Sequence, residues 1–279
     1  MKTWLQGAYD MHFHTAPDIV QRKCDDLELA LRLKAAGMKG AVIKAHYGDT
    51  SARAALLQKQ NPGMIFRGGV TLNTNAWLNP RTVEISAKMG GLFVWFPTLE
   101  VLGYQTYHGN VKTPEDAKKL VAVTNEDGSL KDEALAVIEM AAKYNMIVGT
   151  GHNLAAEGME IVRACARIGS RCVVTHADLP SNWYTVEQLK EAVSLGAVVE
   201  QCYLINHNPK YKVTAAMTAE RIKAVGVEHF YLGTDFGQPG NPYSDEGMEL
   251  FGEALLAAGI TEEELRWMTR EHPEKLFGI

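Results

Sequence analysis

The feature that most constrains this chain is a series of short apolar runs, each separated from the next by longer segments. There are eight such runs: YDMHFHT (9–15), GAVIKAH (40–46), IFRGGVTL (65–72), LFVWFPT (92–98), MIVGTGH (146–152), CVVTHAD (172–178), AVVEQCY (197–203) and HFYLGTD (229–235). Runs of this length that are rich in β-branched residues are typical of strands buried on both faces of a parallel sheet. Each run therefore predicts one strand.

The segments between the runs have the periodicity of amphipathic helices. The clearest of them cover residues 27–37, 133–145, 157–169, 185–196 and 214–226. Several end in glycine, the residue that most readily adopts the left-handed conformation found just after a helix. Strands that alternate with such helices predict βα units.

The spacing of the runs predicts how the units assemble. Successive runs end 25 to 32 residues apart, except for one interval of 54 residues between 98 and 152. Eight units in a row, with no linker rich in Pro, Gly or Ser, predict one domain over residues 1–279. We expect a closed (β/α)8 TIM barrel, which typically needs about 250 residues, rather than an open doubly wound sheet. The long interval predicts a loop after strand four, roughly 99–131, which is either a lid over the site or a surface insertion.

Composition narrows the class of protein further. With 46% hydrophobic and 22% charged residues, the chain is predicted to be globular. A net charge of −5 gives no electrostatic reason to expect nucleic acid or an anionic membrane as a partner. No apolar run is long enough for a membrane span or a signal peptide, so we expect a cytoplasmic protein that binds a small-molecule substrate; a homo-oligomer is compatible with this. The four cysteines include no Cys-x-x-Cys pair; Cys172 and Cys202 lie inside apolar runs and are expected to be buried thiols.

The first run contains a pair of histidines two residues apart. If this run is a strand, Asp10, His12 and His14 point to one face. Two imidazoles in this position can hold a metal ion, although a close pair also arises by chance among nine histidines. A barrel gathers the C-terminal ends of its strands around one site, so ligand-type residues at other strand ends test the idea. Such residues are present: Glu100, His152, His176 and Asp235.

The motifs DMHFH, GTGHN, VTHAD and LGTDFG resemble, in order and placement, those of the amidohydrolase superfamily of metal-dependent barrel enzymes. The combination VIKAHY, VWFPTLE, GTGHN and TDFGQ is similar to an uncharacterised branch of it, known only as a domain of unknown function. The resemblance covers essentially the whole chain. It implies that His12 and His14 hold one divalent metal together with Asp235. It also implies that His152 and His176 hold a second ion or orient substrate and water.

This resemblance implies a cofactor of one or two divalent ions. Zinc is the first expectation, and manganese or iron also suit imidazole and carboxylate ligands. Asp235 would accept a proton from the activated water and deliver it to the leaving group, and His176 would act beside it. Glu100 follows strand four, where some relatives carry a bridging carboxylate; the site is binuclear with it and mononuclear without it.

Several residues near the same strand ends are candidates for substrate binding. Lys44 and His46 share a face at the end of strand two, where they could bind a carboxylate or polarise a carbonyl. Lys44 could instead pair with Glu100 or Asp235. Asp10 either accepts a hydrogen bond from a ligand histidine or bonds to the backbone. Three more residues are expected to shape specificity: Glu200, Tyr203 and Gln238.

These features predict a metal-dependent hydrolase that acts on a C–N or C–O bond of a small molecule, such as a cyclic amide, lactone or ester. A nonoxidative metal-dependent decarboxylase or hydratase is the alternative among enzymes. A metal-binding barrel without activity is the alternative outside them, because a fold alone does not establish activity. The presence of His152, His176 and Glu100 together favours hydrolysis.

Overall fold

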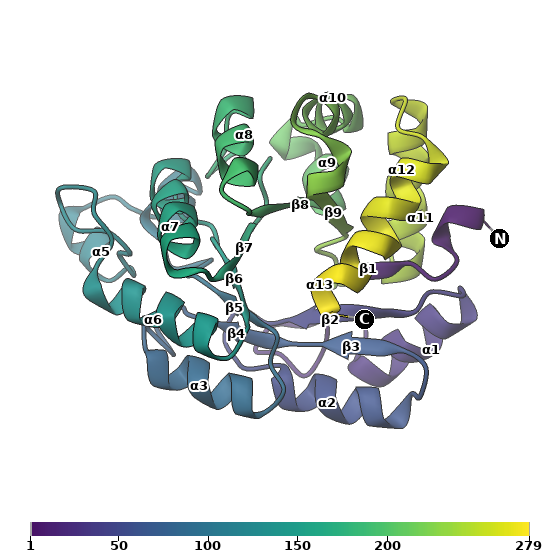
Figure 1. Ribbon diagram of the computed structural model, residues 1–279, viewed down its shortest axis with the longest axis horizontal. Helices are drawn as coiled ribbons and strands as arrows, with labels where there is room; N and C mark the ends of the chain where they lie inside the picture. Colours follow the sequence, from purple (N-terminus) through teal and green to yellow (C-terminus); the bar gives the residue numbers. More distant parts are fainter. Residues whose placement is uncertain (1, 279) are drawn as a thin grey trace. The chain divides into compact units, whose positions relative to one another are not determined.

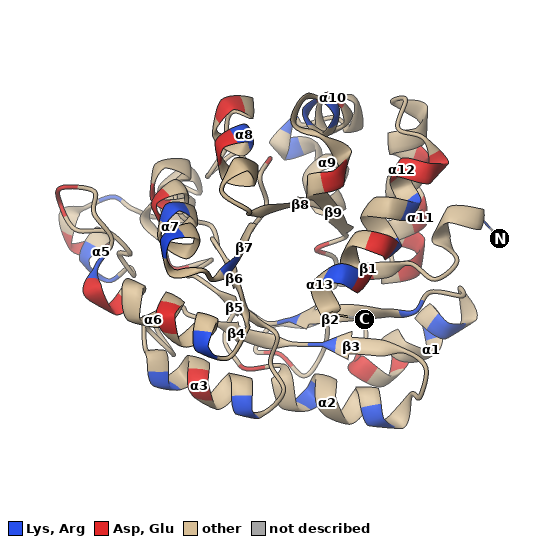
Figure 2. Cartoon of the chain, in the orientation of Figure 1, with Lys and Arg blue, Asp and Glu red and all other residues tan. Residues whose placement is uncertain are grey.

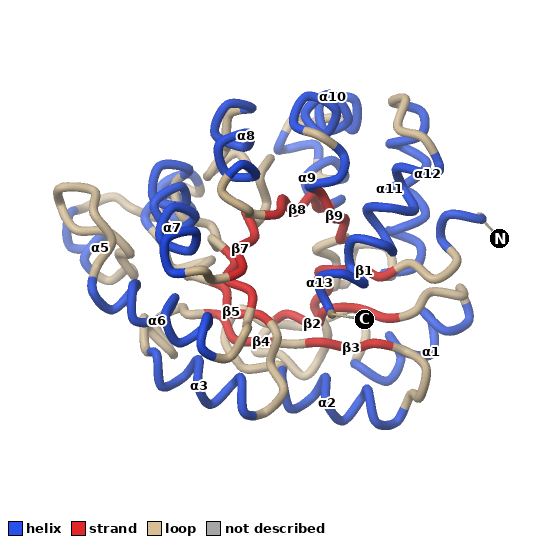
Figure 3. The backbone as a smooth tube through the Cα atoms, viewed as in Figure 1, coloured by secondary structure: helices blue, strands red, loops and turns tan. Residues whose placement is uncertain are grey.

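The computed structural model describes residues 2–278 (Figure 1). These residues divide into two compact units. Among the described residues, unit 1 contains 2–45, 52–68 and 200–278, and unit 2 contains 46–51 and 69–199. Figure 3 shows that helices alternate with strands along the chain. The prediction of one domain over the whole chain stays a prediction.

Unit 1 contains a parallel sheet that carries the His-x-His motif. Strands β1 (Tyr9–His14), β2 (Gly40–Lys44) and β3 (Ile65–Arg67) pair in that order. The register aligns His14 with Lys44 and is irregular between Asp10 and Phe13. On its other side, β1 lies against the end of β9 (Phe230–Gly233), where Phe13 forms a parallel bridge with Phe236. β1 is therefore an interior strand, and all six of its residues are buried.

The helices of unit 1 follow its strands in sequence. They are α1 (Asp26–Ala35), α2 (Ser51–Gln60, which begins at the unit boundary), α9 (Tyr203–His207), α10 (Ala215–Val225), α11 (Ser244–Ala257), α12 (Glu262–Arg266) and α13 (His272–Phe277). Short 3-10 turns cover Thr3–Leu5, Pro209–Tyr211 and Val227–His229, and a π-helical turn covers Trp267–Glu271. Side-chain caps mark the N-termini of several helices. At the start of α1, for example, the Asp25 carboxylate accepts a hydrogen bond from the Glu28 N–H.

Arg53 of α2 fixes the loop that follows the His-x-His motif. Its guanidinium pairs with the Asp26 carboxylate at 2.8 Å. It also donates to the backbone carbonyls of Thr15, Ala16 and Pro17. Because Arg is a planar donor with five N–H groups, one side chain can satisfy this many acceptors. The chain just after His14 is thereby held to α1 and α2.

Unit 2 contains strands that pair with one another in sequence order and in parallel. They are β4 (Gly69–Thr71), β5 (Phe93–Trp95), β6 (Ile147–Gly149), β7 (Arg171–Val174) and the first residues of β8 (Val198–Cys202). Its helices are α3 (Pro80–Lys88), α4 (Leu102–Tyr107), α5 (Pro114–Lys118), α6 (Asp132–Lys143), α7 (Ala155–Ile168) and α8 (Val186–Ser194). β8 crosses the boundary in sequence, so Glu200 and the residues after it belong to unit 1.

The predicted elements are largely confirmed. Every apolar run contains a strand, and the third run is divided between β3 and β4. The five predicted amphipathic segments form α1, α6, α7, α8 and α10. Gly169 follows α7 with φ 78°, as a glycine after a helix should. Segment 99–131 is not structureless, because it contains α4 and α5.

Burial follows the predicted pattern. Charged residues lie mainly on the helices (Figure 2), while the strands are mostly apolar; besides the ionisable residues of the site, they contain Arg67 in β3 and Arg171 in β7. The four cysteines are buried and form no disulfide. Within residues 2–278, no helix has the length and apolar character that crossing a membrane requires.

Asp10 links β1 to the segment after β9. Its fully buried carboxylate accepts hydrogen bonds from the Thr234 N–H at 2.9 Å, the Thr234 hydroxyl at 2.6 Å, the Ser244 hydroxyl at 2.7 Å and the His12 N–H at 3.2 Å. Burial raises the pKa of Asp10 to about 6, and these hydrogen bonds oppose the rise. Of the two expected roles, the structure therefore shows bonding to the backbone.

The Asp10→Ala variant should lose stability because it leaves buried donors without an acceptor. We expect its free energy of unfolding to fall by about 3 kcal/mol, while Ser244→Ala, which removes one of these bonds, should cost about 1 kcal/mol. Urea denaturation followed by circular dichroism measures both. A loss of less than about 0.5 kcal/mol for Asp10→Ala would show that this linkage does not stabilise the fold.

Candidate metal centre

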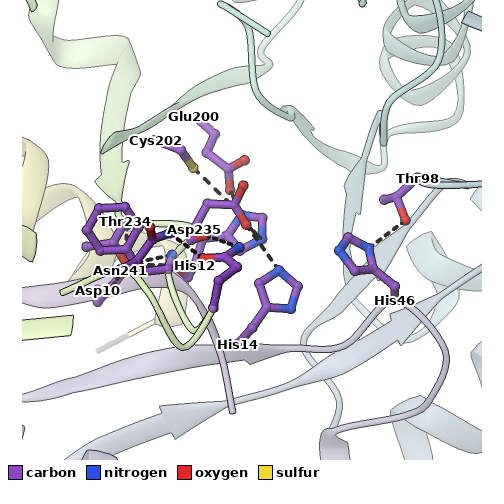
Figure 4. A network of polar contacts seen from close by, with 12 residues as sticks. Asp10, His12, His14, His46, Thr98, Glu200, Cys202, Thr234, Asp235 and Asn241 are labelled. Carbon is purple, nitrogen blue, oxygen red and sulfur yellow. Dashed lines mark hydrogen bonds and ion pairs between the residues drawn. The ribbon is translucent and has the colours of Figure 1, made fainter. Parts of the chain in front are cut away.

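Three side chains of unit 1 converge on one point. The Nε2 atom of His12 lies 3.2 Å from Oδ1 of Asp235, and Nε2 of His14 lies 3.1 Å from the same oxygen (Figure 4). One ligand atom from each residue lies within 4.8 Å of the others. Both histidine side chains are buried, while that of Asp235 is 13% exposed. Two imidazole nitrogens and a carboxylate oxygen form a donor set that suits a divalent metal.

Local sequence explains how these side chains meet. His12 and His14 alternate with Met11 and Phe13 along β1, so they share one face of the strand. Asp235 follows β9, and its backbone N–H donates to the carbonyl of His12 at 2.8 Å. Its φ is 55°, a left-handed conformation that is uncommon outside glycine and is often found at functional sites.

Gly237 allows the chain after Asp235 to pass close to β1. Its φ is 127°, and a Cβ atom at this position would lie 2.0 Å from the carbonyl oxygen of His14. Only glycine fits without a backbone shift. Gln238 braces the same turn, because its side-chain amide donates to the carbonyl of Asp235 at 3.2 Å and its amide oxygen accepts from Asn241 at 2.6 Å. The prediction that Gln238 contacts substrate is untested.

His14 is held in the neutral form that a metal requires. Burial lowers the pKa of His14 to about 3, although its bond with Asp235 opposes this. The guanidinium of Arg22 lies 3.3 Å from Nδ1 of His14 and pairs with Asp18 at 2.7 Å. Both of these charged side chains are almost fully buried. Neither Arg22 nor Asp18 is predictable as part of the site, since a loop has no periodicity that marks its inward side chains.

A second carboxylate contacts the other ring nitrogen of His12, Nδ1. Oε1 of Glu200 lies 3.1 Å from Nδ1 of His12, and the Tyr231 hydroxyl donates to the same oxygen at 3.0 Å. The thiol of Cys202 lies 3.8 Å from that nitrogen. Glu200 is thus bonded to a candidate ligand histidine, and its expected contribution to substrate specificity stays a prediction. Tyr203 packs against the ring of Phe251, with centroids 5.1 Å apart.

Lys44 ends β2 and is completely buried. Burial lowers the pKa of its ammonium group, while the charges of Glu200 and Asp235 raise it. The expected pairing of Lys44 with Glu100 or Asp235 stays a prediction. Contact between Lys44 and a substrate stays a prediction.

Unit 2 contains a separate group of histidines. The rings of His152 and His176 have centroids 5.0 Å apart, and those of His46 and His152 are 6.1 Å apart. The Thr98 hydroxyl lies 2.9 Å from Nδ1 of His46 (Figure 4). The φ angle of His176 is 49°, so its backbone is in the left-handed conformation, like that of Asp235. These residues lie together as the strand order predicts, and their role as metal or substrate ligands stays a prediction.

Glu100 also lies in unit 2, just after β5. One of its carboxylate oxygens accepts the backbone N–H of Thr74 at 2.6 Å. The pKa of the Tyr47 phenol is raised to about 12, mainly by burial and also by the negative charge of Glu100 and its hydrogen bond with Glu100. Among residues 2–278, Glu100 is not one of the side chains whose spacing suits a shared metal ion. Its predicted role as a ligand is untested, and its observed contacts are with Thr74 and Tyr47.

Comparison with known families identifies the family of the chain. Residues 7–200, more than half of the sequence, match a family of unknown function, DUF6282. The chain belongs to this family. No curated protein matches the sequence significantly.

Solved structures show which fold the chain has. It is similar to an amidohydrolase from Pseudomonas aeruginosa, with a TM-score of 0.65, 13% identity and coverage of 98% of this chain and 96% of that one. It is also similar to a putative 2-pyrone-4,6-dicarboxylic acid hydrolase from Pseudomonas putida, with a TM-score of 0.62, 17% identity and coverage of 98% of this chain and 97% of that one. A third similar structure is a 2,6-dihydroxybenzoate decarboxylase from Rhizobium, with a TM-score of 0.58, 10% identity and coverage of 98% of this chain and 99% of that one. The chain therefore has the α/β TIM-barrel fold of amidohydrolase-superfamily enzymes, as predicted.

The Gly237→Ala variant should weaken metal binding because the added methyl group pushes the turn after Asp235 away from His14. We expect the Kd for Zn²⁺ to rise at least 10-fold, measured by competition with a chromophoric chelator. Gly240→Ala is the matched control, since a Cβ at that position meets nothing within 4 Å. Equal Kd values for the two variants would contradict the proposed link between this turn and the metal ligands.

Proposed function

We propose that this protein is a metal-dependent hydrolase that cleaves a C–N or C–O bond in a small molecule such as a cyclic amide, lactone or ester. The observation that carries the proposal is the convergence of His12 Nε2 and His14 Nε2 on one oxygen of Asp235. The fold supports it, because hydrolases and decarboxylases are among the similar structures. We further propose that the protein acts in the cytoplasm.

The residues of unit 1 supply the parts that such a reaction needs. His12 and His14 would hold a divalent ion, for which zinc is the first candidate and manganese or iron are alternatives. Such an ion would supply Lewis-acid chemistry that lowers the pKa of water to about 7. Asp235, the most exposed of the three, can accept a proton through its carboxylate and return it to the leaving group. Burial lowers the pKa of His14 and so favours its neutral form; coordination through Nε2 requires that this nitrogen be unprotonated.

The number of ions depends on unit 2. We propose that His152 and His176 supply ligands or orient substrate, as the resemblance implies. Metal analysis of His152→Ala and His176→Ala tests this assignment. A loss of one of two equivalents in either variant would support a binuclear site. Unchanged content would assign these histidines to substrate or structure.

Turnover should depend on Asp235. In a panel of lactones, cyclic amides and esters, we expect the Asp235→Asn variant to lose at least 100-fold in kcat against the best substrate while remaining folded, because an amide cannot accept the proton. Asp127→Asn is a matched control, since Asp127 is an exposed loop residue bonded to Ser129.

A second assay separates hydrolysis from the alternatives. Release of CO₂ from aromatic carboxylates, without hydrolysis of any panel member, would assign a decarboxylase instead. Equal turnover by Asp235→Asn and the original protein would remove Asp235 from the mechanism. Metal binding without turnover on either panel would favour a binding protein.

A further inference from the structure

A buried chain of polar groups leads away from the candidate metal centre on the far nitrogen of His12. It runs from Nδ1 of His12 to Oε1 of Glu200, at 3.1 Å, and from there to the hydroxyl of Tyr231, at 3.0 Å. All three side chains are at most 1% exposed. Figure 4 shows Glu200 and Asp235 as the partners of His12.

The chemistry of these groups determines where the imidazole proton lies. An ionised carboxylate accepts hydrogen bonds and cannot donate them, and the Tyr231 hydroxyl is already a donor to the same oxygen. When Glu200 is ionised, His12 therefore needs a proton on Nδ1 to bond with it. In a neutral imidazole the other nitrogen, Nε2, then has the lone pair. That nitrogen is the one that lies 3.2 Å from Asp235.

Other groups near Nδ1 do not replace Glu200. The Cys202 sulfur is 3.8 Å away, and burial raises the pKa of its thiol well above the usual value, so it remains a weak neutral partner. Lys44 is buried in the same unit, and its positive charge interacts favourably with Glu200. A buried carboxylate is costly unless it is hydrogen-bonded, and Tyr231 and His12 supply hydrogen bonds to Glu200.

We propose that Glu200 is a positioning residue that holds the His12 imidazole in the Nδ1-protonated form, with the Nε2 lone pair directed at the metal. This inference rests on the metal site of the proposed function. Carboxylates that accept the N–H of a metal-bound histidine fix its ring orientation and tautomer and raise its basicity. Glu200 would thus act on the metal through His12, without contacting substrate.

The Glu200→Gln variant tests the inference through metal affinity. The amide keeps the shape of the side chain but loses its charge, and its NH₂ group can donate to Nδ1 and so permit the other tautomer. We expect the Kd for Zn²⁺ to rise 10- to 100-fold. Glu253→Gln is the matched control, because it makes the same change in a half-exposed ion pair with Lys2. Its Kd should equal that of the original protein.

A second readout follows the tautomer directly and needs no metal. In the metal-free protein labelled with ¹⁵N-histidine, we expect His12 to show a protonated Nδ1. Glu200→Gln should shift this signal, and Glu253→Gln should not. A structural role alone would change stability without moving the tautomer.

The outcomes separate this inference from the proposed function. If the original protein binds no Zn²⁺, the proposed function fails, and the tautomer measurement still decides whether Glu200 sets the state of His12. If the protein binds Zn²⁺ and Glu200→Gln binds it equally well with an unchanged tautomer, the positioning role is overturned. A His12 that is unprotonated at Nδ1 in the original protein overturns it too, even if the variant does not fold.

Discussion

The candidate site depends on the pairing of β1 with the segment that follows β9. The Asp235 N–H donates to the carbonyl of His12, the His14 N–H donates to the carbonyl of Phe236, and the Asp10 carboxylate bonds to Thr234. These bonds fix the backbone on both sides of the site. The left-handed backbone at Asp235 is held by the same contacts. Asp235 consequently faces both histidines, although more than 220 residues separate them in sequence.

Concentrating ionisable groups inside unit 1 opposes folding unless each group has a partner. Asp10, His12, His14, Lys44 and Glu200 are all almost fully buried. Burial lowers the pKa of His14 and Lys44 and raises that of Asp10, so it opposes the charged form in each case. A divalent ion would compensate the carboxylate charge and use the neutral imidazoles. Function, rather than packing, best explains why this interior is polar.

Much of the fold and part of the site follow from local sequence. Periodicity and spacing predict the strands and helices, and the alternation of side chains along a strand predicts that His12 and His14 share a face. Placement at a strand end makes Asp235 one of several candidates, and the resemblance to the amidohydrolase superfamily associates it with the two histidines. Each of these predictions needs only the sequence of one element and the topology of the fold.

Other features could not be predicted because they depend on contacts between distant segments. Glu200 looks like any polar residue at a strand end, and only the structure shows its carboxylate on Nδ1 of His12. Arg22 and Asp18 lie in a loop without a repeating pattern. Glu100 follows its strand as expected, yet its carboxylate bonds to the Thr74 backbone. In each case the direction of one side chain, and not the element that carries it, decides the role.

The most direct test of the central claim is a crystal structure of the protein grown with Zn²⁺, with anomalous data collected on both sides of the zinc absorption edge. The account predicts an anomalous peak about 2.0 to 2.2 Å from Nε2 of His12, Nε2 of His14 and a carboxylate oxygen of Asp235. A peak on the other side of the His12 ring, about 2.3 Å from the Cys202 sulfur, or no peak at all, would contradict it.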